Sequence, residues 1–315
     1  MSYSLNKLYA VIGISKQGVH GLIVHWQATQ KRFAELETVV MQIRSDHPVM
    51  ALRTIHQKLG PIGIGRDRFE NHFVSLGYKV KVHKNYRRTT DSRGVTRFDN
   101  LVRGITLNKI NQVWVSDITY FEIRNRFYYL TFIMDAFSRR IVGHSASATL
   151  STEETTLPAL RMAIKTRKAL CKETIFHSDG GGQYYSKDFL ALIRKHEMKN
   201  SMAEDVYDNA AAERLNGVIK NNYLVHRKIE SFGDLVKELD RSVKLYNQHK
   251  PHKSINDQTP EEFEQRLHSF ATQQKTEGEK VTDGKFRNRG ASSPLIPGNK
   301  KPQDQNVLLE NLVRG

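Results

Sequence analysis

Three consecutive strand-like segments in the middle of the chain constrain its fold more than any other feature. Residues 111–123, 126–137 and 139–147 are rich in β-branched and aromatic side chains and are separated by short turns. Strands joined by such short connections pair in antiparallel order. The second segment is apolar on both faces, so we expect it to lie inside the sheet.

The segments that follow turn this sheet into a mixed α/β layer. A helical pattern over 153–168, a short strand over 173–178 and helical patterns near 186–197, 208–224 and 231–249 come next. This order is compatible with a ribonuclease H-like sheet. From Ala271 the sequence is polar and contains Pro and Gly. Such a composition buries too little apolar surface to order itself, so we predict a disordered basic tail over 271–315.

The first third of the chain predicts two helical units. Over 5–26, apolar residues at helical spacing are interrupted by Gly-Ile-Ser at 13–15, the pattern of a helix-turn-helix. Lys16 and Gln17 would then face base edges in a major groove, whereas a plain helical hairpin is the alternative.

A second helical pattern occupies 46–90, and several Lys and Arg residues cluster toward its end. Its predicted DNA-binding residues are Arg66, Arg68, Lys84, Arg87 and Arg88. We therefore divide the chain into helical segments over 1–45 and 46–90, a linker over 91–110, a core over 111–270 and the tail.

Charge is concentrated where these helical units lie. Residues 1–110 hold 18 Lys and Arg against 7 Asp and Glu, whereas residues 111–270 hold 23 against 21. The whole chain has a net charge of +16. A basic first third favours contact with phosphates, although a solvated basic surface would look the same.

Several classes of protein are excluded. The single cysteine, Cys171, cannot form an intramolecular disulfide or a cysteine-rich zinc site. No run approaches the roughly 18 to 20 apolar residues of a membrane span, and the first residues lack the pattern of an export signal. We expect a cytoplasmic protein.

Two acidic residues accompany the predicted strands. Asp117 lies within the first strand, where burial of an ionised carboxylate would be costly unless a cation compensates. Asp179 directly follows the strand over 173–178 and precedes three glycines, which would let a metal ion or a DNA backbone come close. The alternative, a phosphate-binding P-loop, is disfavoured because no Gly-Lys-Ser/Thr follows.

A third carboxylate, Glu213, lies near the start of the helix predicted over 208–224. Lys220 returns to nearly the same helix face seven residues later, with Asn216 between them. An ordinary surface helix is an equal alternative when this helix is taken alone. Together, however, three clustered carboxylates need cations among them, and oxygen-only ligation suits Mg²⁺ or Mn²⁺. Two such ions would support cleavage or transfer of a phosphodiester.

The combination of these motifs resembles the catalytic core of retroviral-integrase-like DDE transposases. The resemblance covers roughly residues 45 to 270 and is closest to second-reading-frame products of bacterial insertion sequences. Its motifs are VWVSDITYF, MDAFSRRIVG, HSDGGGQYYS, SMAEDVYDNAAAERLNGVIK and YNQHKPHKSI.

The resemblance implies a fold, a site and partners. The fold would be a ribonuclease H-like mixed five-stranded sheet flanked by helices. Asp117, Asp179 and Glu213 would form the catalytic and metal-binding triad, Lys220, Asn216 and Lys250 would contact DNA, and Asp135 would support the site. The substrate would be double-stranded DNA at element ends and at the target.

Further partners follow from the same resemblance. A homo-oligomer would hold two DNA ends, and the chain would act near the bacterial nucleoid. A first-frame protein with its own helix-turn-helix and leucine zipper would be a partner or be fused to this chain. We see no heptad repeat here, so we expect the zipper to lie on that protein.

Three positions depart from the family pattern. The spacing between Asp179 and Glu213 is 33 residues where the family usually has 35. Asn222 replaces a frequent acid, and Lys250 replaces a frequent arginine.

We therefore predict a transposase that cleaves element ends and transfers the resulting strands. A nuclease without joining activity and a catalytically silent DNA-binding regulator are the alternatives.

Overall fold

The computed structural model describes residues 4–80, 98–204 and 206–269, and the chain divides into two compact units, Met1–Val82 and His83–Gly315. The predicted tail over 271–315 lies outside the described residues, as do Lys84, Arg87 and Arg88. Among the described helices, none combines the length and apolar character needed to cross a lipid bilayer.

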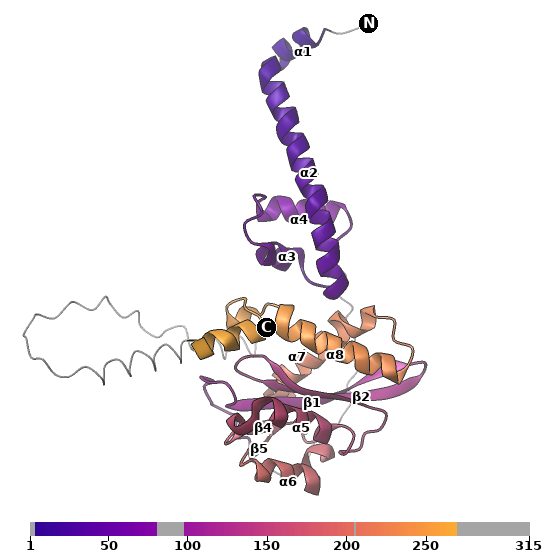
Figure 1. The fold of residues 1–315 in the computed structure, drawn as a ribbon, viewed down its shortest axis with the longest axis vertical. Helices are drawn as coiled ribbons and strands as arrows, with labels where there is room; N and C mark the ends of the chain where they lie inside the picture. The colour runs from indigo at the N-terminus through magenta and orange to yellow at the C-terminus, as the bar shows by residue number, and fades with distance from the viewer. Residues whose placement is uncertain (1–3, 81–97, 205, 270–315) are drawn as a thin grey trace, which may run out of the picture. The chain divides into compact units, whose positions relative to one another are not determined.

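The first unit consists of four helices, labelled in Figure 1. They are α1 (Leu5–Ile12), α2 (Lys16–Asp46), α3 (Leu52–Leu59) and α4 (Arg66–Ser75). Gly13 ends α1 with a left-handed φ of 72°, which costs glycine little, and the Ser15 hydroxyl caps α2 by accepting from the Gly18 N–H. The predicted helix, turn and helix are therefore present, but the second helix continues to Asp46.

The core of this unit lies at one end of α2. Thr29, Phe33, Leu36 and Val40 are the buried residues of α2. The apolar ones pack with residues of α3, α4 and the loops between them, namely Met50, Leu52, Ile55, Ile64, Phe69 and Phe73. In contrast, α1 has no buried residue.

The second unit contains a five-stranded sheet in the order β3-β2-β1-β4-β5. The strands are β1 (Val113–Ile123), β2 (Arg126–Asp135), β3 (Ile141–Ser147), β4 (Ile175–Ser178) and β5 (Lys199–Met202). The first three pair in antiparallel order, whereas β4 pairs parallel to β1 and to β5. The predicted mixed five-stranded, ribonuclease H-like sheet is confirmed.

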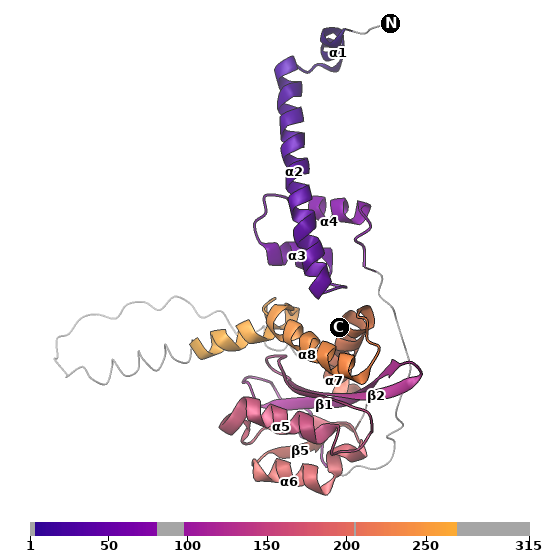
Figure 2. The same ribbon diagram turned by 45° about the vertical axis from the view of Figure 1, so that its right-hand side comes forward.

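Helices cover both faces of this sheet (Figure 2). One face packs against α7 (Ala210–Asn222) and α8 (Phe232–His249), the other against α5 (Thr156–Arg167) and α6 (Lys187–Lys195). Alternation along β1 explains the two layers, because Val113 and Val115 point to the first core and Trp114 points to the second. The interior position of β2, between β1 and β3, agrees with its apolar faces.

Candidate active site

The pairing of β1 with β4 brings the first two acids together. Ser116 and Ser178 are Cα partners in this parallel pair, so Asp117 and Asp179 follow at the next position on each side. Parallel strands lie about 4.8 Å apart, so the backbones at these two positions are neighbours. Asp117 remains in β1, whereas at Asp179 the chain leaves the sheet.

The Asp117 carboxylate is held by two donors. Its Oδ1 accepts from the Ile118 N–H at 2.9 Å, and its Oδ2 accepts from the Asn216 side-chain amide at 2.7 Å. Asn216 is only 5% exposed. We predict from sequence that Asn216 contacts DNA; in the structure its amide binds Asp117, which gives it a positioning role.

The Asn216 contact is one of two amide contacts that fix α7 beside β1. Asn209, the residue before the helix, donates from its side chain to the Ser116 carbonyl at 2.9 Å. Glu213 therefore lies in the first turn of α7, between the two anchored positions, and its side chain is exposed. The slim turn of alanines before Glu213 packs toward the sheet through the buried Ala212.

The charge environment of Asp117 includes the other two acids. Burial raises the pKa of Asp117 from 3.8 to about 7, and the negative charges of Asp179 and Glu213 add to this rise. The hydrogen bonds from Ile118 and Asn216 oppose it. Burial also raises the pKa of Asp179.

The glycines and aromatics after Asp179 have separate functions. The Gly181 N–H donates to Asp179 Oδ1 at 3.2 Å, and a Cβ at Gly181 would lie only 3.1 Å from that oxygen. Gly182, by contrast, has open space around it. The Tyr185 hydroxyl donates to the Asp179 carbonyl at 2.8 Å, so it holds the backbone of the acid in place.

Tyr184 ties this loop to β1. Its fully buried hydroxyl lies 2.9 Å from Ser116 Oγ, which itself donates to the Phe132 carbonyl at 2.8 Å. The only proton of Ser116 is thus used, so Tyr184 is the donor in its pair. Burial and the nearby charges of Asp179 and Asp117 raise the pKa of Tyr184 well above its usual value, which keeps this proton in place.

Lys220 lies two turns after Glu213 on α7. Its Nζ is 3.3 Å from the Tyr120 carbonyl, 3.5 Å from the Thr119 hydroxyl and 4.6 Å from the centre of the Tyr120 ring. Burial lowers the pKa of Lys220. The cation therefore lies beside the half of β1 that follows Asp117.

Lys250, at the end of α8, lies among partly buried groups. Its Nζ is 5.7 Å from the centre of the Tyr246 ring, and burial lowers its pKa to about 8. The pKa of the neighbouring His252 is lowered to about 2 by burial and by the charges of Lys250 and Arg139. A cation with little solvation is suited to an anionic partner.

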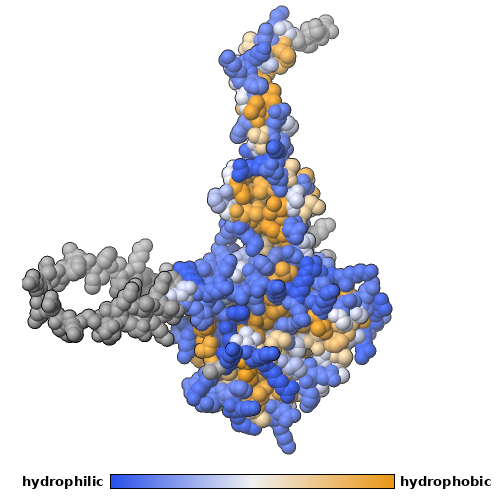
Figure 3. Space-filling model, viewed as in Figure 1, coloured by the Kyte–Doolittle hydropathy of each residue, from blue (hydrophilic) through white to orange (hydrophobic). Residues whose placement is uncertain are grey.

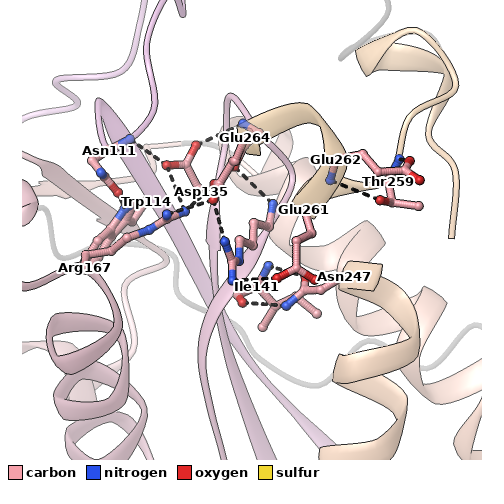
Figure 4. Close-up of polar contacts among 12 residues, drawn as sticks. Asn111, Trp114, Asp135, Ile141, Arg167, Asn247, Thr259, Glu261, Glu262 and Glu264 are labelled. Atoms are coloured by element: carbon pink, nitrogen blue, oxygen red, sulfur yellow. Dashed lines mark hydrogen bonds and ion pairs between the residues drawn. The ribbon is translucent and has the colours of Figure 1, made fainter. Parts of the chain in front are cut away.

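Sequence reasoning missed a buried ionic cluster behind the end of β2 (Figure 4). Asp135 is fully buried and accepts from the N–H groups of Asn111, at 2.6 Å, and Ser138, at 3.0 Å. Arg167 of α5 lies 3.9 Å from Asp135 and forms a bidentate pair with Glu264, from a helical stretch over 260–269. Nothing in the sequence around Arg167 or Glu264 marks this long-range pairing.

The DNA-binding residues predicted in the first unit lie on exposed helix surface. Lys16 and Gln17 occupy the first turn of α2. Arg66 is paired with Asp67 at 2.7 Å, and Arg68 is exposed on α4. DNA contact at these positions stays a prediction.

Asp117, Asp179 and Glu213 do not form a preassembled metal site. Within 4–80, 98–204 and 206–269, no three His, Cys, Asp or Glu side chains stand close enough to coordinate one ion. The oxygen-only donors of Asp117, Asp179 and Glu213 fit a hard divalent cation in kind.

Two family models described as "Integrase core domain" match this chain, over residues 108–205 and 194–260. An "Insertion element IS600 uncharacterized 31 kDa protein" of Shigella sonnei is 28% identical over 83% of this chain and 98% of its own length. A "Putative transposase for insertion sequence element IS986/IS6110" of Mycobacterium tuberculosis is 30% identical over 64% of this chain and 76% of its own length.

Among solved structures, the HTLV-2 integrase catalytic core domain in complex with magnesium is 20% identical over 49% of this chain and 95% of its own. The TM-score of that comparison is 0.39. The sequence relatives alone decide the assignment, because the mycobacterial transposase is matched over three quarters of its length. This chain therefore belongs to the insertion-sequence transposases that carry an integrase core domain.

Proposed function

We propose that this chain is a transposase that cleaves DNA at the ends of an insertion sequence and transfers the freed ends to target DNA. In the first step a water oxygen bonds to phosphorus and the 3′ oxygen leaves as a hydroxyl. In the second step that 3′ oxygen bonds to a target phosphorus and displaces another 3′ oxygen. Each step forms one phosphorus–oxygen bond and breaks one.

The pairing of β1 with β4, which places Asp117 beside Asp179, supports this proposal most directly. The pKa of Asp117, raised by burial and by the charges of Asp179 and Glu213, agrees with an acidic site at this position. Two Mg²⁺ or Mn²⁺ ions held there would favour deprotonation of the attacking hydroxyl and stabilise the leaving oxygen. Asp117 and Asp179 would hold the ions jointly, and Glu213 would complete the second site.

The protein's own groups have distinct parts in this arrangement. Asn216 and the Ile118 N–H orient the Asp117 carboxylate, and Tyr184 and Tyr185 fix the loop that carries Asp179. Lys220 would bind a DNA phosphate beside β1, and Lys250 would bind another. The basic first third of the chain would bind the element end through Lys16, Gln17, Arg66, Arg68, Lys84, Arg87 and Arg88.

The proposal includes partners and a location. Because two element ends must be held at once, we expect a homo-oligomer that binds double-stranded DNA at the nucleoid of the bacterial cytoplasm. A first-frame protein with a helix-turn-helix and leucine zipper stays a predicted partner.

A joining assay tests the function. Full-length protein is incubated with Mg²⁺ or Mn²⁺ and labelled element-end DNA, beside Asp117→Asn, Asp179→Asn and Glu213→Gln. Asp257→Asn is the matched control, because Asp257 is exposed and its φ of 56° suits asparagine.

We expect joined products from the wild type and from the control, and binding without chemistry from the three site variants. Cleavage without joining would identify the nuclease instead. Binding alone by the wild type would identify the regulator.

A further inference from the structure

The first half of α2 and all of α1 present apolar side chains that nothing in the first unit covers. The surface formed by these residues, here called the α1/α2 surface, is visible in part in Figure 3. Its exposed fractions run from 47% to 86%. Its members are Leu5, Leu8, Val11, Ile12, Leu22 and Trp26.

The same stripe of α2 is buried further along the helix. Thr29, Phe33, Leu36 and Val40 are buried, and they follow one another at alternating spacings of four, three and four residues. The same alternation, continued toward the start of α2, gives Trp26, Leu22 and Val19. This is the 3-4 spacing of a helix that packs along its length against other helices. Packing covers only one half of the stripe within this unit.

This pattern corrects the expectation that the chain has no heptad repeat. Two features conceal the repeat in the sequence. The polar Thr29 occupies one stripe position, and the apolar Ile23, Val24 and Val39 lie outside the stripe. Only the burial of Phe33, Leu36 and Val40 shows which apolar positions belong to the stripe.

The helix α1 also lacks a core of its own. It has eight residues and none of them is buried. Isolated helices shorter than about 12 to 15 residues are marginal in water, so tertiary packing must supply most of their stability. The described first unit supplies no such packing for α1, which points to a surface that is completed by association.

The lack of charged residues on this part of α2 limits which partner can bind the α1/α2 surface. Residues 17–30 contain no Lys, Arg, Asp or Glu. Phosphate backbones are bound mainly through cations, so this stretch is a poor surface for DNA. The excess positive charge of this chain lies mainly in its first third, where a second copy would be repelled wherever cations face each other, but two uncharged helix faces can meet without this repulsion.

The size of the surface is sufficient for a stable dimer. These six side chains expose on the order of 700 Å² per chain, which is within the range of one side of a standard protein interface. We propose that the α1/α2 surface binds the same surface of a second copy of this chain, with Leu22 and Trp26 at its centre. Association of the two copies would bury the first half of the α2 stripe, whose second half is already covered by α3 and α4.

Sedimentation equilibrium tests the proposal on nuclease-treated full-length protein in 0.5 M salt, without DNA or divalent ions. The variant Leu22→Glu places a charge on the surface, and Leu170→Glu is the matched control because the two leucines are 60% and 59% exposed. We expect dimers for the wild type and for the control. Leu22→Glu should raise the dimer Kd by about 100-fold or more.

Tryptophan fluorescence gives a second measurement on the same samples. The chain has two tryptophans; Trp114 is fully buried and Trp26 is 59% exposed. A blue shift with rising concentration would therefore report burial of Trp26. We expect that shift in the wild type and in Leu170→Glu, at concentrations where Leu22→Glu lacks it.

Three outcomes would overturn the proposal. They are a wild type that stays monomeric at every concentration, a Leu22→Glu variant that dimerises as the wild type does, and an association that nuclease treatment removes. Loss of association after nuclease treatment would show that DNA, and not the α1/α2 surface, holds the copies together. Because these measurements need no cleavage, their failure leaves the proposed transposase activity standing, and loss of joining activity in Asp117→Asn bears only on the active site.

Discussion

Neutralising Asp117 should stabilise the protein without divalent cations and abolish DNA cleavage. Burial, together with the charges of Asp179 and Glu213, raises the pKa of Asp117 from 3.8 to about 7. At ~1.36 kcal/mol for each tenfold change in proton affinity, this corresponds to about 4 kcal/mol against the ionised form. The amide of Asp117→Asn would lose part of the hydrogen bonding to Ile118 and Asn216, so we expect a net gain of about 2 kcal/mol.

The gain has a defined dependence on pH. Because the pKa of Asp117 is higher in the folded state, the folded protein binds this proton more tightly than the unfolded chain does. The penalty from ionisation is thus absent below pH 3.8, grows as the pH rises and is complete above about pH 7. The advantage of Asp117→Asn should be greatest at pH 8 and vanish near pH 4.

Thermal unfolding in EDTA checks this prediction, with Asp257→Asn as the control. A gain of about 2 kcal/mol should raise Tm by about 4 to 8 °C at pH 8 in a unit of this size. Mg²⁺ should raise Tm for the wild type and leave Asp117→Asn unchanged. An unchanged or lowered Tm for Asp117→Asn at pH 8, or an advantage that does not vary with pH, would refute the electrostatic reasoning.

Three further results are expected. Tyr184→Phe keeps the buried ring but loses the bond to Ser116, so the joining assay should show kcat lowered roughly tenfold with KM for DNA unchanged; an unchanged kcat would count against the positioning role. Glu264→Gln removes the bidentate carboxylate partner of the buried Arg167 and leaves it only the more distant Asp135, so urea unfolding should show a loss of about 3 to 5 kcal/mol; a loss under about 1 kcal/mol would contradict this. The salt dependence of DNA binding should have a log–log slope of about −0.9 for each phosphate contact, and Lys220→Met should reduce that slope by about 1; an identical slope would remove Lys220 from the contacts.

The central sheet could be predicted because its strands are long and locally paired. Residues predicted as strands over 111–123, 126–137 and 139–147 form β1, β2 and β3 with ends displaced by at most two residues. The turns between them are short, so each strand pairs with its neighbour in sequence. Local patterns were enough to fix this part of the fold.

The fifth strand and the ionic cluster depend on distant partners. β5 has the sequence KNSM, which carries no strand-like pattern, and its pairing with β4 provides the hydrogen bonds. Arg167 and Glu264 are separated by 97 residues. Buried ion pairs of this kind are favourable only when both partners are in place, so neither residue alone gives a signal in the sequence.

The acidic residues of the site could be predicted because carboxylates are chemically distinctive, whereas the neutral residues that position them could not. An amide at 216 can donate to Asp117 whether or not the acid is ionised, and it adds no charge to a site where three acids already repel one another. Aspartate at 216 would be similar in shape but would place a fourth carboxylate at hydrogen-bonding distance from Asp117, which would raise the pKa of Asp117 further. The site therefore requires a neutral donor at this position as strictly as it requires the acids, and only the folded arrangement of β1 and α7 reveals that requirement.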